Sequence, residues 1–279
     1  MTDQQNTAIQ PVCTLLGMTR SNYYKQRTQR RRREVDESFL LDLIHRERSV
    51  QPQLGLRKLL YLIRPALAEA GVKIGRDRFR DLLFRYELLI ERKRNYCRTT
   101  NSWHGFGVYP NRLKDAELTG PNQAWVSDIT YLRTASGFVY LALITDAFSR
   151  AIIGWDCSDS LEAVGAMRAL KMALRGLPKG CPPPIHHSDR GCQYCCGDYI
   201  ALLKRRELSI SMTEENHCYE NAQAERVNGI LKQEYGLGQT LHDPAEARRM
   251  ARQAIDLYNH RRPHLALNMA FPMTVHHAA

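Results

Sequence analysis

The sequence predicts an α/β protein in which a mixed sheet flanked by helices follows an all-α region containing a helix-turn-helix. Three observations lead to this fold class. The 279 residues suffice for one or two domains with their own cores. Apolar residues recur at helical spacing up to about residue 90, whereas strand-like apolar runs begin at about residue 124. The net charge is equally uneven, because residues 1–110 contain 21 Lys and Arg against 11 Asp and Glu, and residues 111–279 contain 19 against 18.

The first helical elements lie in residues 12–27. An apolar turn is followed by Gly17, by Thr19 as a cap, and then by a short polar and aromatic helix. This order is typical of a helix-turn-helix. The arginine run at 30–33 is interpreted as a solvated linker that also contacts phosphate.

Three further helical segments complete the basic region. Their apolar stripes are Phe39, Leu40, Leu43 and Ile44, then Leu56, Leu59, Leu60 and Ile63, then Phe79, Leu82 and Leu83. We expect the second helix to stop near Pro65 and the third to span 76–86. The third helix suits a reader of the DNA major groove, with DNA contacts expected from Arg76, Arg78 and Arg80. A basic three-helix bundle that binds another protein is the alternative.

The second half of the chain predicts the sheet. After a linker at 95–123, strands are expected at 124–132, 138–146, 151–156, 184–188 and 208–212, with a turn at 135–137. Helices are expected at 161–174, 198–206, 220–235 and 244–258. We therefore predict two domains, a helical DNA-binding region at 1–110 and an α/β core with a C-terminal helix at 111–279.

Composition excludes several functional classes. The longest apolar run, 138–144, is too short to span a membrane, and residues 1–30 lack the apolar segment of a secretory signal. No phosphate-binding loop, dinucleotide fingerprint or nucleophile elbow occurs. The basic N-terminal region favours a polyanionic partner, although a merely solubilising surface is the simpler alternative.

Three acidic residues occupy positions where a carboxylate is costly. Asp128 lies inside an apolar strand, Asp189 ends another strand, and Glu225 is expected in the middle of a helix. Burying these charges requires compensation, and carboxylate oxygens suit Mg²⁺ or Mn²⁺. Two acids on neighbouring strands and one on a helix across them can hold two ions that activate a hydroxyl and stabilise a leaving oxygen. Each acid taken alone is more often structural, so the prediction depends on the set.

The helix around Glu225 supports this site. Asn221, Glu225, Asn228 and Lys232 are spaced four, three and four apart, so they share one helix face. Lys232 is expected to contact a DNA phosphate beside the metal ions. The alternative is an ordinary amphipathic helix with surface charges.

These motifs resemble the DDE integrase core, and specifically the OrfB transposases of bacterial insertion sequences in the sequence-three family. The matching segments are Trp125-x-x-Asp128-Ile129-Thr130-Tyr131, His187-Ser188-Asp189-Arg190-Gly191-x-Gln193-Tyr194, Asn221-Ala222-x-x-Glu225, Leu231-Lys232-x-Glu234 and Tyr258-Asn259-x-x-Arg262-Pro263-His264-x-x-Leu267. Thirty-five residues separate Asp189 from Glu225, a spacing typical of this family. With the N-terminal helix-turn-helix included, the resemblance covers nearly the whole chain.

The resemblance implies a ribonuclease-H-like fold and a Mg²⁺-dependent transposase with Asp128, Asp189 and Glu225 as catalytic and metal-binding residues. It implies two Mg²⁺ ions, replaceable by Mn²⁺, cleavage at the ends of the element, and strand transfer by the freed 3′-hydroxyl. The expected partners are double-stranded DNA (the terminal inverted repeats and the target), further copies of the chain in a homo-oligomer on DNA, and the upstream helix-turn-helix protein of the element. The expected location is the bacterial cytoplasm, with nucleoid association through DNA.

Other interpretations remain open at this point. A DNA-binding regulator with an inert core is disfavoured by the complete set of acids, and a nuclease that cuts without joining is disfavoured by the large basic region. A zinc site at the cysteines and histidines around Asp189 is a weak alternative to plain thiols. Trp125 and Tyr131 suit the core better than base stacking. DNA binding and anchoring of the C-terminus are equally compatible with Tyr258, Asn259, Arg262 and His264.

Overall fold

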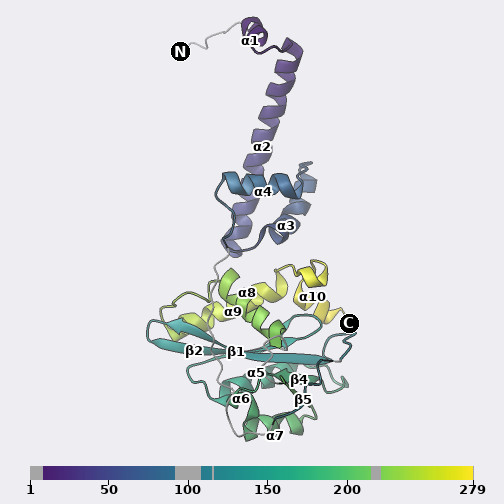
Figure 1. Cartoon of the computed structure of the whole chain (residues 1–279), viewed down its shortest axis with the longest axis vertical. Helices are drawn as coiled ribbons and strands as arrows, with labels where there is room; N and C mark the ends of the chain where they lie inside the picture. The colour runs from purple at the N-terminus through teal and green to yellow at the C-terminus, as the bar shows by residue number, and fades with distance from the viewer. Residues whose placement is uncertain (1–8, 92–107, 115, 215–220, 279) are drawn as a thin grey trace.

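A computed structural model describes residues 9–91, 108–114, 116–214 and 221–278. Four helices form an N-terminal helical region, and a sheet covered by helices on both faces forms the α/β core (Figure 1). The longest helix projects away from the core and carries the first helix at its far end.

The predicted helix-turn-helix turn is present. Helix α1 spans Ile9–Leu15 and α2 begins at Arg20. Gly17 between them has φ +62°, a left-handed conformation that glycine adopts without a steric penalty. The hydroxyl of Thr19 accepts a hydrogen bond from the backbone N–H of Asn22 at 3.2 Å, so Thr19 is the expected cap.

The linker interpretation of residues 30–33 is wrong, because α2 is one continuous helix over Arg20–Val50. Arginine is a good helix former, and no Gly or Pro interrupts the chain between residues 20 and 50. The short polar helix and the later apolar stripe are thus parts of the same element.

The predicted stop at Pro65 is also wrong, since α3 spans Leu56–Glu69 and contains this proline. Leu60, Ile63 and Leu67 are buried at helical spacing, so the apolar face continues beyond it. Burial of Leu67 offsets the hydrogen bond that the proline nitrogen cannot donate. Helix α4, Arg76–Arg85, follows the prediction, and its Phe79, Leu82 and Leu83 pack with α3 and the second half of α2.

The predicted mixed sheet is confirmed, and the structure supplies the order and direction of its strands. Strands β1 (Ala124–Thr134), β2 (Gly137–Asp146) and β3 (Ile152–Ser158) pair antiparallel, and β4 (Ile185–Ser188) and β5 (Ser209–Met212) extend the sheet in parallel beside β1. The order across the sheet is β3-β2-β1-β4-β5. Strand β1 is therefore central, with β2 along one edge and β4 along the other.

Helices cover both faces of the sheet (Figure 1). Helices α5 (Ala163–Gly176), α6 (Cys192–Cys195) and α7 (Gly197–Arg205) lie on one face, and α8 (Ala222–Glu234) and α9 (Pro244–His260) on the other. The short α6, the 3-10 turn Leu265–Leu267 and α10 (Pro272–His277) were not predicted, because such short elements carry no periodic signal. The described parts of the expected linker, 108–114 and 116–123, contain no helix or strand.

The helical region contacts the core through a polar junction. Lys58 of α3 lies 3.2 Å from Glu234 at the end of α8, and Arg262 binds the same carboxylate through two contacts of 2.7 Å. Gln51 accepts a hydrogen bond from the hydroxyl of Tyr235 at 3.0 Å. Among the described residues, no helix has the length and apolar character needed to cross a bilayer.

Candidate active site

Strands β1 and β4 place Asp128 and Asp189 next to each other. Their parallel pairing ends at Ser127 opposite Ser188, so the next residue on each strand is one of the two aspartates. Both side chains are half-buried. Asp128 and Asp189 thus lie at adjacent positions. They mark the point where β4 ends and β1 continues without a partner strand on that side.

Glu225 lies in the first turn of α8, so the prediction that it lies in the middle of a helix is wrong. The described helix begins only at Ala222, and residue 220, where the helix was predicted to start, lies outside the described residues. Near a helix N-terminus the helix dipole favours a negative charge. Asn221 anchors this end of α8 to β1, because its side-chain amide donates to the Ser127 carbonyl at 3.3 Å.

The three carboxylates influence one another electrostatically. Burial, then the charges of Asp189 and Glu225, raise the pKa of Asp128 to about 7, against opposing hydrogen bonds from Asn228 and the Ile129 amide. Burial and the charge of Asp189 also raise the pKa of Glu225. The fold therefore brings all three predicted acids close enough together for their charges to raise the pKa values of Asp128 and Glu225.

Asn228 orients the central carboxylate. Its amide Nδ2 donates to Oδ2 of Asp128 at 2.7 Å, and its own Oδ1 is buried without a hydrogen-bond partner in the described part of the chain. Directly after β4, Oδ1 of Asp189 accepts a hydrogen bond from the Gly191 amide at 3.0 Å. The predicted common face of α8 is confirmed for Asn221 and Asn228, which both contact β1.

The donor set fits a hard divalent cation. Within the described residues, no three His, Cys, Asp or Glu side chains already have the geometry of a shared metal site. The carboxylates are nevertheless neighbours, and burial, followed by the charges of Asp189 and Glu225, raises the pKa of Asp128. Oxygen donors of this kind are the preferred ligands of Mg²⁺ and Mn²⁺.

The histidines beside Asp189 have structural contacts instead of a zinc-binding arrangement. His186 Nε2 lies 2.8 Å from both the Ser127 hydroxyl and the Tyr199 hydroxyl, and burial lowers the pKa of His186 to about 3. His187 Nδ1 pairs with the Ser211 hydroxyl at 2.8 Å, on the other face of β4. Burial raises the pKa of the Cys195 thiol to about 11, which disfavours the thiolate that zinc requires.

The predicted DNA-contacting residues fall in two places. Arg76, Arg78 and Arg80 are exposed on α4, in the helical region and apart from the carboxylates (Figure 1). Two of these arginines form exposed ion pairs with the aspartate that follows each of them. Lys232 is half-buried on α8, two turns after Glu225.

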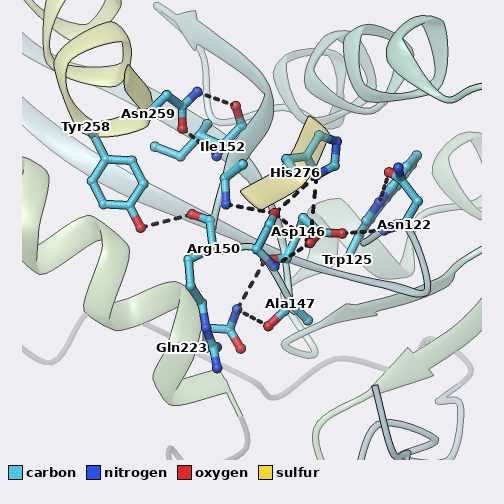
Figure 2. A network of polar contacts seen from close by, with 12 residues as sticks. Asn122, Trp125, Asp146, Ala147, Arg150, Ile152, Gln223, Tyr258, Asn259 and His276 are labelled. Atoms are coloured by element: carbon cyan, nitrogen blue, oxygen red, sulfur yellow. Dashed lines mark hydrogen bonds and ion pairs between the residues drawn. The ribbon is translucent and has the colours of Figure 1, made fainter. Parts of the chain in front are cut away.

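The C-terminal motif anchors the chain. Asn259 forms two hydrogen bonds with the backbone of Ile152, at 2.9 and 2.8 Å, and the Tyr258 hydroxyl donates to the Arg150 carbonyl at 3.0 Å (Figure 2). Arg262 is 2% exposed and binds Glu234. For these three residues the structure favours anchoring over DNA contact.

A buried network behind the site was not predicted. Asp146 is fully buried at the end of β2 and accepts from the Asn122 amide and from the amide and hydroxyl of Ser149, each at 2.7 Å (Figure 2). His276 of α10 lies 3.9 Å from the same carboxylate. Gln223 of α8 donates to the neighbouring Ala147 carbonyl at 3.1 Å, which fixes the helix turn that carries Glu225. An aspartate closing an apolar run is the only sequence signal for this network.

Known proteins resemble this chain over most of its length. A family model described as integrase core domain matches residues 119–218, and a second model of that description matches 206–272. The insertion element IS600 uncharacterized 31 kDa protein of Shigella sonnei is 35% identical over 267 residues, covering 94% of this chain and 96% of that protein. Transposase InsF for insertion sequence IS3A of Escherichia coli is 36% identical over 241 residues, covering 83% and 80%.

The fold also resembles a solved viral assembly. The simian T-cell lymphotropic virus intasome, solved in complex with the PP2A regulatory subunit B56 gamma, matches with a TM-score of 0.50 and 18% identity, covering 80% of this chain and 74% of that chain. At this identity the match supports the fold alone. It agrees with the ribonuclease-H-like core expected from the sequence.

Proposed function

The chain belongs to the transposases of IS3-type insertion sequences, which contain an integrase core domain, and we propose that Asp128, Asp189 and Glu225 are its catalytic carboxylates. It is an enzyme of DNA transposition and integration, a polynucleotidyl transferase. The observation that supports the site assignment is geometric: Asp128 and Asp189 directly follow the last paired residues of β1 and β4, and α8, which carries Glu225 in its first turn, is bound to Asp128 through Asn228.

In this proposal the protein itself contributes by holding the three carboxylates, and their negative charges, at fixed positions. Strand pairing holds Asp128 and Asp189 at fixed adjacent positions, and Asn228 keeps one oxygen of Asp128 turned toward α8. Asn221 and Gln223 hold the first turn of α8 against β1 and the end of β2, so Glu225 has a fixed place across the site. Such preorganisation lowers the cost of assembling a phosphoryl-transfer site.

The three carboxylates would hold the divalent ions, two Mg²⁺ or Mn²⁺ in our proposal. When bound, such ions activate the attacking hydroxyl and stabilise the negative charge on the leaving oxygen. Asp128 contributes its ionised form to this binding, so a nearby cation is expected to lower its raised pKa. Lys232, on the same helix, is proposed to contact a phosphate of the bound DNA.

The helical region is proposed to recognise the DNA ends. Its positive charge supports phosphate contacts, and the exposed arginines of α4 are suited to reach a groove. We propose residues 1–110 as the DNA-binding domain and 111–279 as the catalytic domain, working as a homo-oligomer on the bacterial chromosome. The upstream protein of the element is a proposed further partner.

Carboxylate variants test the proposal. Asp128→Asn, Asp189→Asn and Glu225→Gln should each reduce end cleavage about a thousandfold or more, since the lost ligand is worth several kcal/mol in the transition state. Gel-shift affinity for an end-sequence duplex should stay nearly unchanged. Asp256→Asn, an exposed carboxylate on α9, is the matched control and should cleave normally. Normal cleavage by any one of the three variants would remove that residue from the site.

A further inference from the structure

Five exposed basic side chains gather at one edge of the α/β core, where helices α5 and α7 end. The two helices lead into β4 and β5, which are parallel neighbours and begin side by side at Ile185 and Ser209. Because the strands run in the same direction, the chain segments that precede them lie at the same edge of the sheet. We call the five residues the basic edge; they are Arg175, Lys179, Lys204, Arg205 and Arg206.

Packing holds the two helix ends next to each other. Leu203 of α7 is buried in the apolar cluster against which Leu177, the residue after α5, packs. A backbone hydrogen bond of 3.2 Å from the Ser209 amide to the Pro184 carbonyl joins the two segments as they enter the strands. The basic side chains of the two segments therefore belong to one surface.

The charge of the basic edge is not neutralised by the protein. Segments 175–184 and 204–208 contain five cations and a single acid, Glu207. Within the part of the chain that the structure describes, none of the five cations forms an ion pair with an acid. Residues 111–279 as a whole contain 19 Lys and Arg against 18 Asp and Glu, so the basic edge is a local excess of positive charge in a nearly neutral core.

Helix capping explains only part of this charge. A basic residue in the last turn of a helix gains about 0.3 to 1 kcal/mol from the helix dipole, which accounts for Arg175 and for the end of α7. Lys179 lies three residues beyond the end of α5, outside the reach of that effect. Lys204, Arg205 and Arg206 are consecutive, so their like charges repel one another unless an anion lies among them.

The basic edge lies away from both surfaces already assigned to DNA. Asp189 follows Ser188, the last residue of β4, whereas the basic edge precedes its first residue, Ile185. Four strand residues at about 3.3 Å each put about 13 Å of β4 between the two. Figure 1 shows α7 at the end of the core farthest from the helical region. DNA on the basic edge is therefore a different segment from DNA at the carboxylates or on α4.

We propose that the basic edge binds a second segment of double-stranded DNA through its phosphates. This inference rests on the proposed function, because it takes the carboxylate site to be occupied by another segment. Duplex DNA carries one negative charge per about 1.7 Å of its axis, so several of the five cations can each meet a phosphate. Counterions released from these phosphates supply affinity without any sequence preference. Three of the five cations are arginines, which pair with phosphate through two parallel hydrogen bonds.

A bridging assay tests the proposal with the full-length chain. A fluorescent duplex of the element's end is mixed with the protein and with a random-sequence duplex attached to beads, in EDTA, so that binding is measured without catalysis. Fluorescence retained on the beads reports protein that holds both duplexes. The triple variant Lys204→Ala, Arg205→Ala, Arg206→Ala should retain at least about tenfold less and lower the slope of log retention against log salt by about 3. Its affinity for the end duplex alone should stay nearly unchanged.

Controls separate phosphate binding from misfolding and from the loss of net charge. The triple variant Arg112→Ala, Lys114→Ala, Arg252→Ala removes three exposed cations elsewhere in the core and should bridge as the wild type does. The double variant Arg205→Lys, Arg206→Lys keeps the charge and should also bridge.

Two results would overturn the proposal: no bridging by the wild type, or undiminished bridging by the alanine variant of the basic edge. Undiminished bridging together with a loss of poly-glutamate binding in that variant would assign the surface to an acidic protein instead. The carboxylate variant Asp128→Asn should bridge normally, so a failure of the proposed function and a failure of this inference give different results.

Discussion

Replacing Asp128 with asparagine should stabilise the metal-free protein at pH 8 while abolishing catalysis. The pKa of Asp128 is raised from its ordinary value of 3.8 to about 7 by burial and by its two acidic neighbours. At 1.36 kcal/mol for each pKa unit, this difference corresponds to at most about 4 kcal/mol of destabilisation by the ionised carboxylate. The side chain is half-buried, so water screens part of this effect, and we expect a gain of about 2 to 4 kcal/mol.

The pH dependence has a definite sign. Between about pH 4 and 7 the folded state keeps the Asp128 proton, whereas the unfolded chain has lost it. The stability contributed by this residue is therefore full below pH 4 and falls as pH rises toward 7. Asp128→Asn should lack this fall, because its amide does not titrate and can still accept the hydrogen bond from Asn228.

Urea unfolding at pH 5 and pH 8, with EDTA or with Mg²⁺, measures both effects. The wild type should gain stability from Mg²⁺ at pH 8, since a ligand that binds only the folded state stabilises it. Asp128→Asn should exceed the wild type in EDTA and respond little to Mg²⁺, and Asp256→Asn should behave as the wild type. Equal stability of Asp128→Asn and the wild type in EDTA at pH 8 would refute the electrostatic argument.

Three further predictions concern the anchoring contacts and the helical region. Arg262→Met should lower the free energy of unfolding in urea by about 3 to 5 kcal/mol, because Glu234 is then buried without its main partner. The control Arg261→Met, which removes a more exposed ion pair with Glu47, should lower it by at most about 1 kcal/mol. Hydrogen bonds hold the pKa of Asp146 below its ordinary value despite burial, so Asp146→Asn should be less stable than the wild type at pH 7. The difference in the free energy of unfolding between the two proteins should shrink as pH falls below about 4, where the wild-type carboxylate becomes protonated. Replacing the three α4 arginines with alanine should lower the slope of log affinity against log salt by about 3, and an unchanged slope in a filter-binding titration would exclude phosphate contacts there.

The strands and long helices of the core were predictable because their signals are local. Apolar runs marked β1 and β2, and the Ala135-Ser136-Gly137 turn located the hairpin between them. The failures at residues 30–33 and at Pro65 have another cause. Whether a basic run or an internal proline ends a helix depends on what the following turn buries, and Leu67 shows that tertiary burial decides it.

The carboxylates were predictable for a different reason. An acid inside a strand, such as Asp128, or directly after a strand, such as Asp189, is conspicuous in the sequence. The residues that position these acids carry no such signal. Asp146, Gln223 and His276 act through backbone carbonyls and through contacts between distant segments. No spacing rule links residues 76 positions apart, so this support could be recognised only in the folded chain.

Helix α8 is held at both ends, and this links the C-terminal motif to the three proposed catalytic carboxylates. Gln223 fixes its first turn to the end of β2, while Glu234 at its other end is bound by Arg262 from the segment after α9 and by Lys58 from the helical region. A helix restrained at two points cannot slide along the sheet without breaking buried polar contacts, each of which costs several kcal/mol when left unpaired. The position of Glu225 relative to Asp128 thus depends on contacts with three separate parts of the chain. One of these contacts comes from Lys58 in the helical region. A displacement of that region on DNA binding would therefore change the restraint on α8, the helix that carries Glu225.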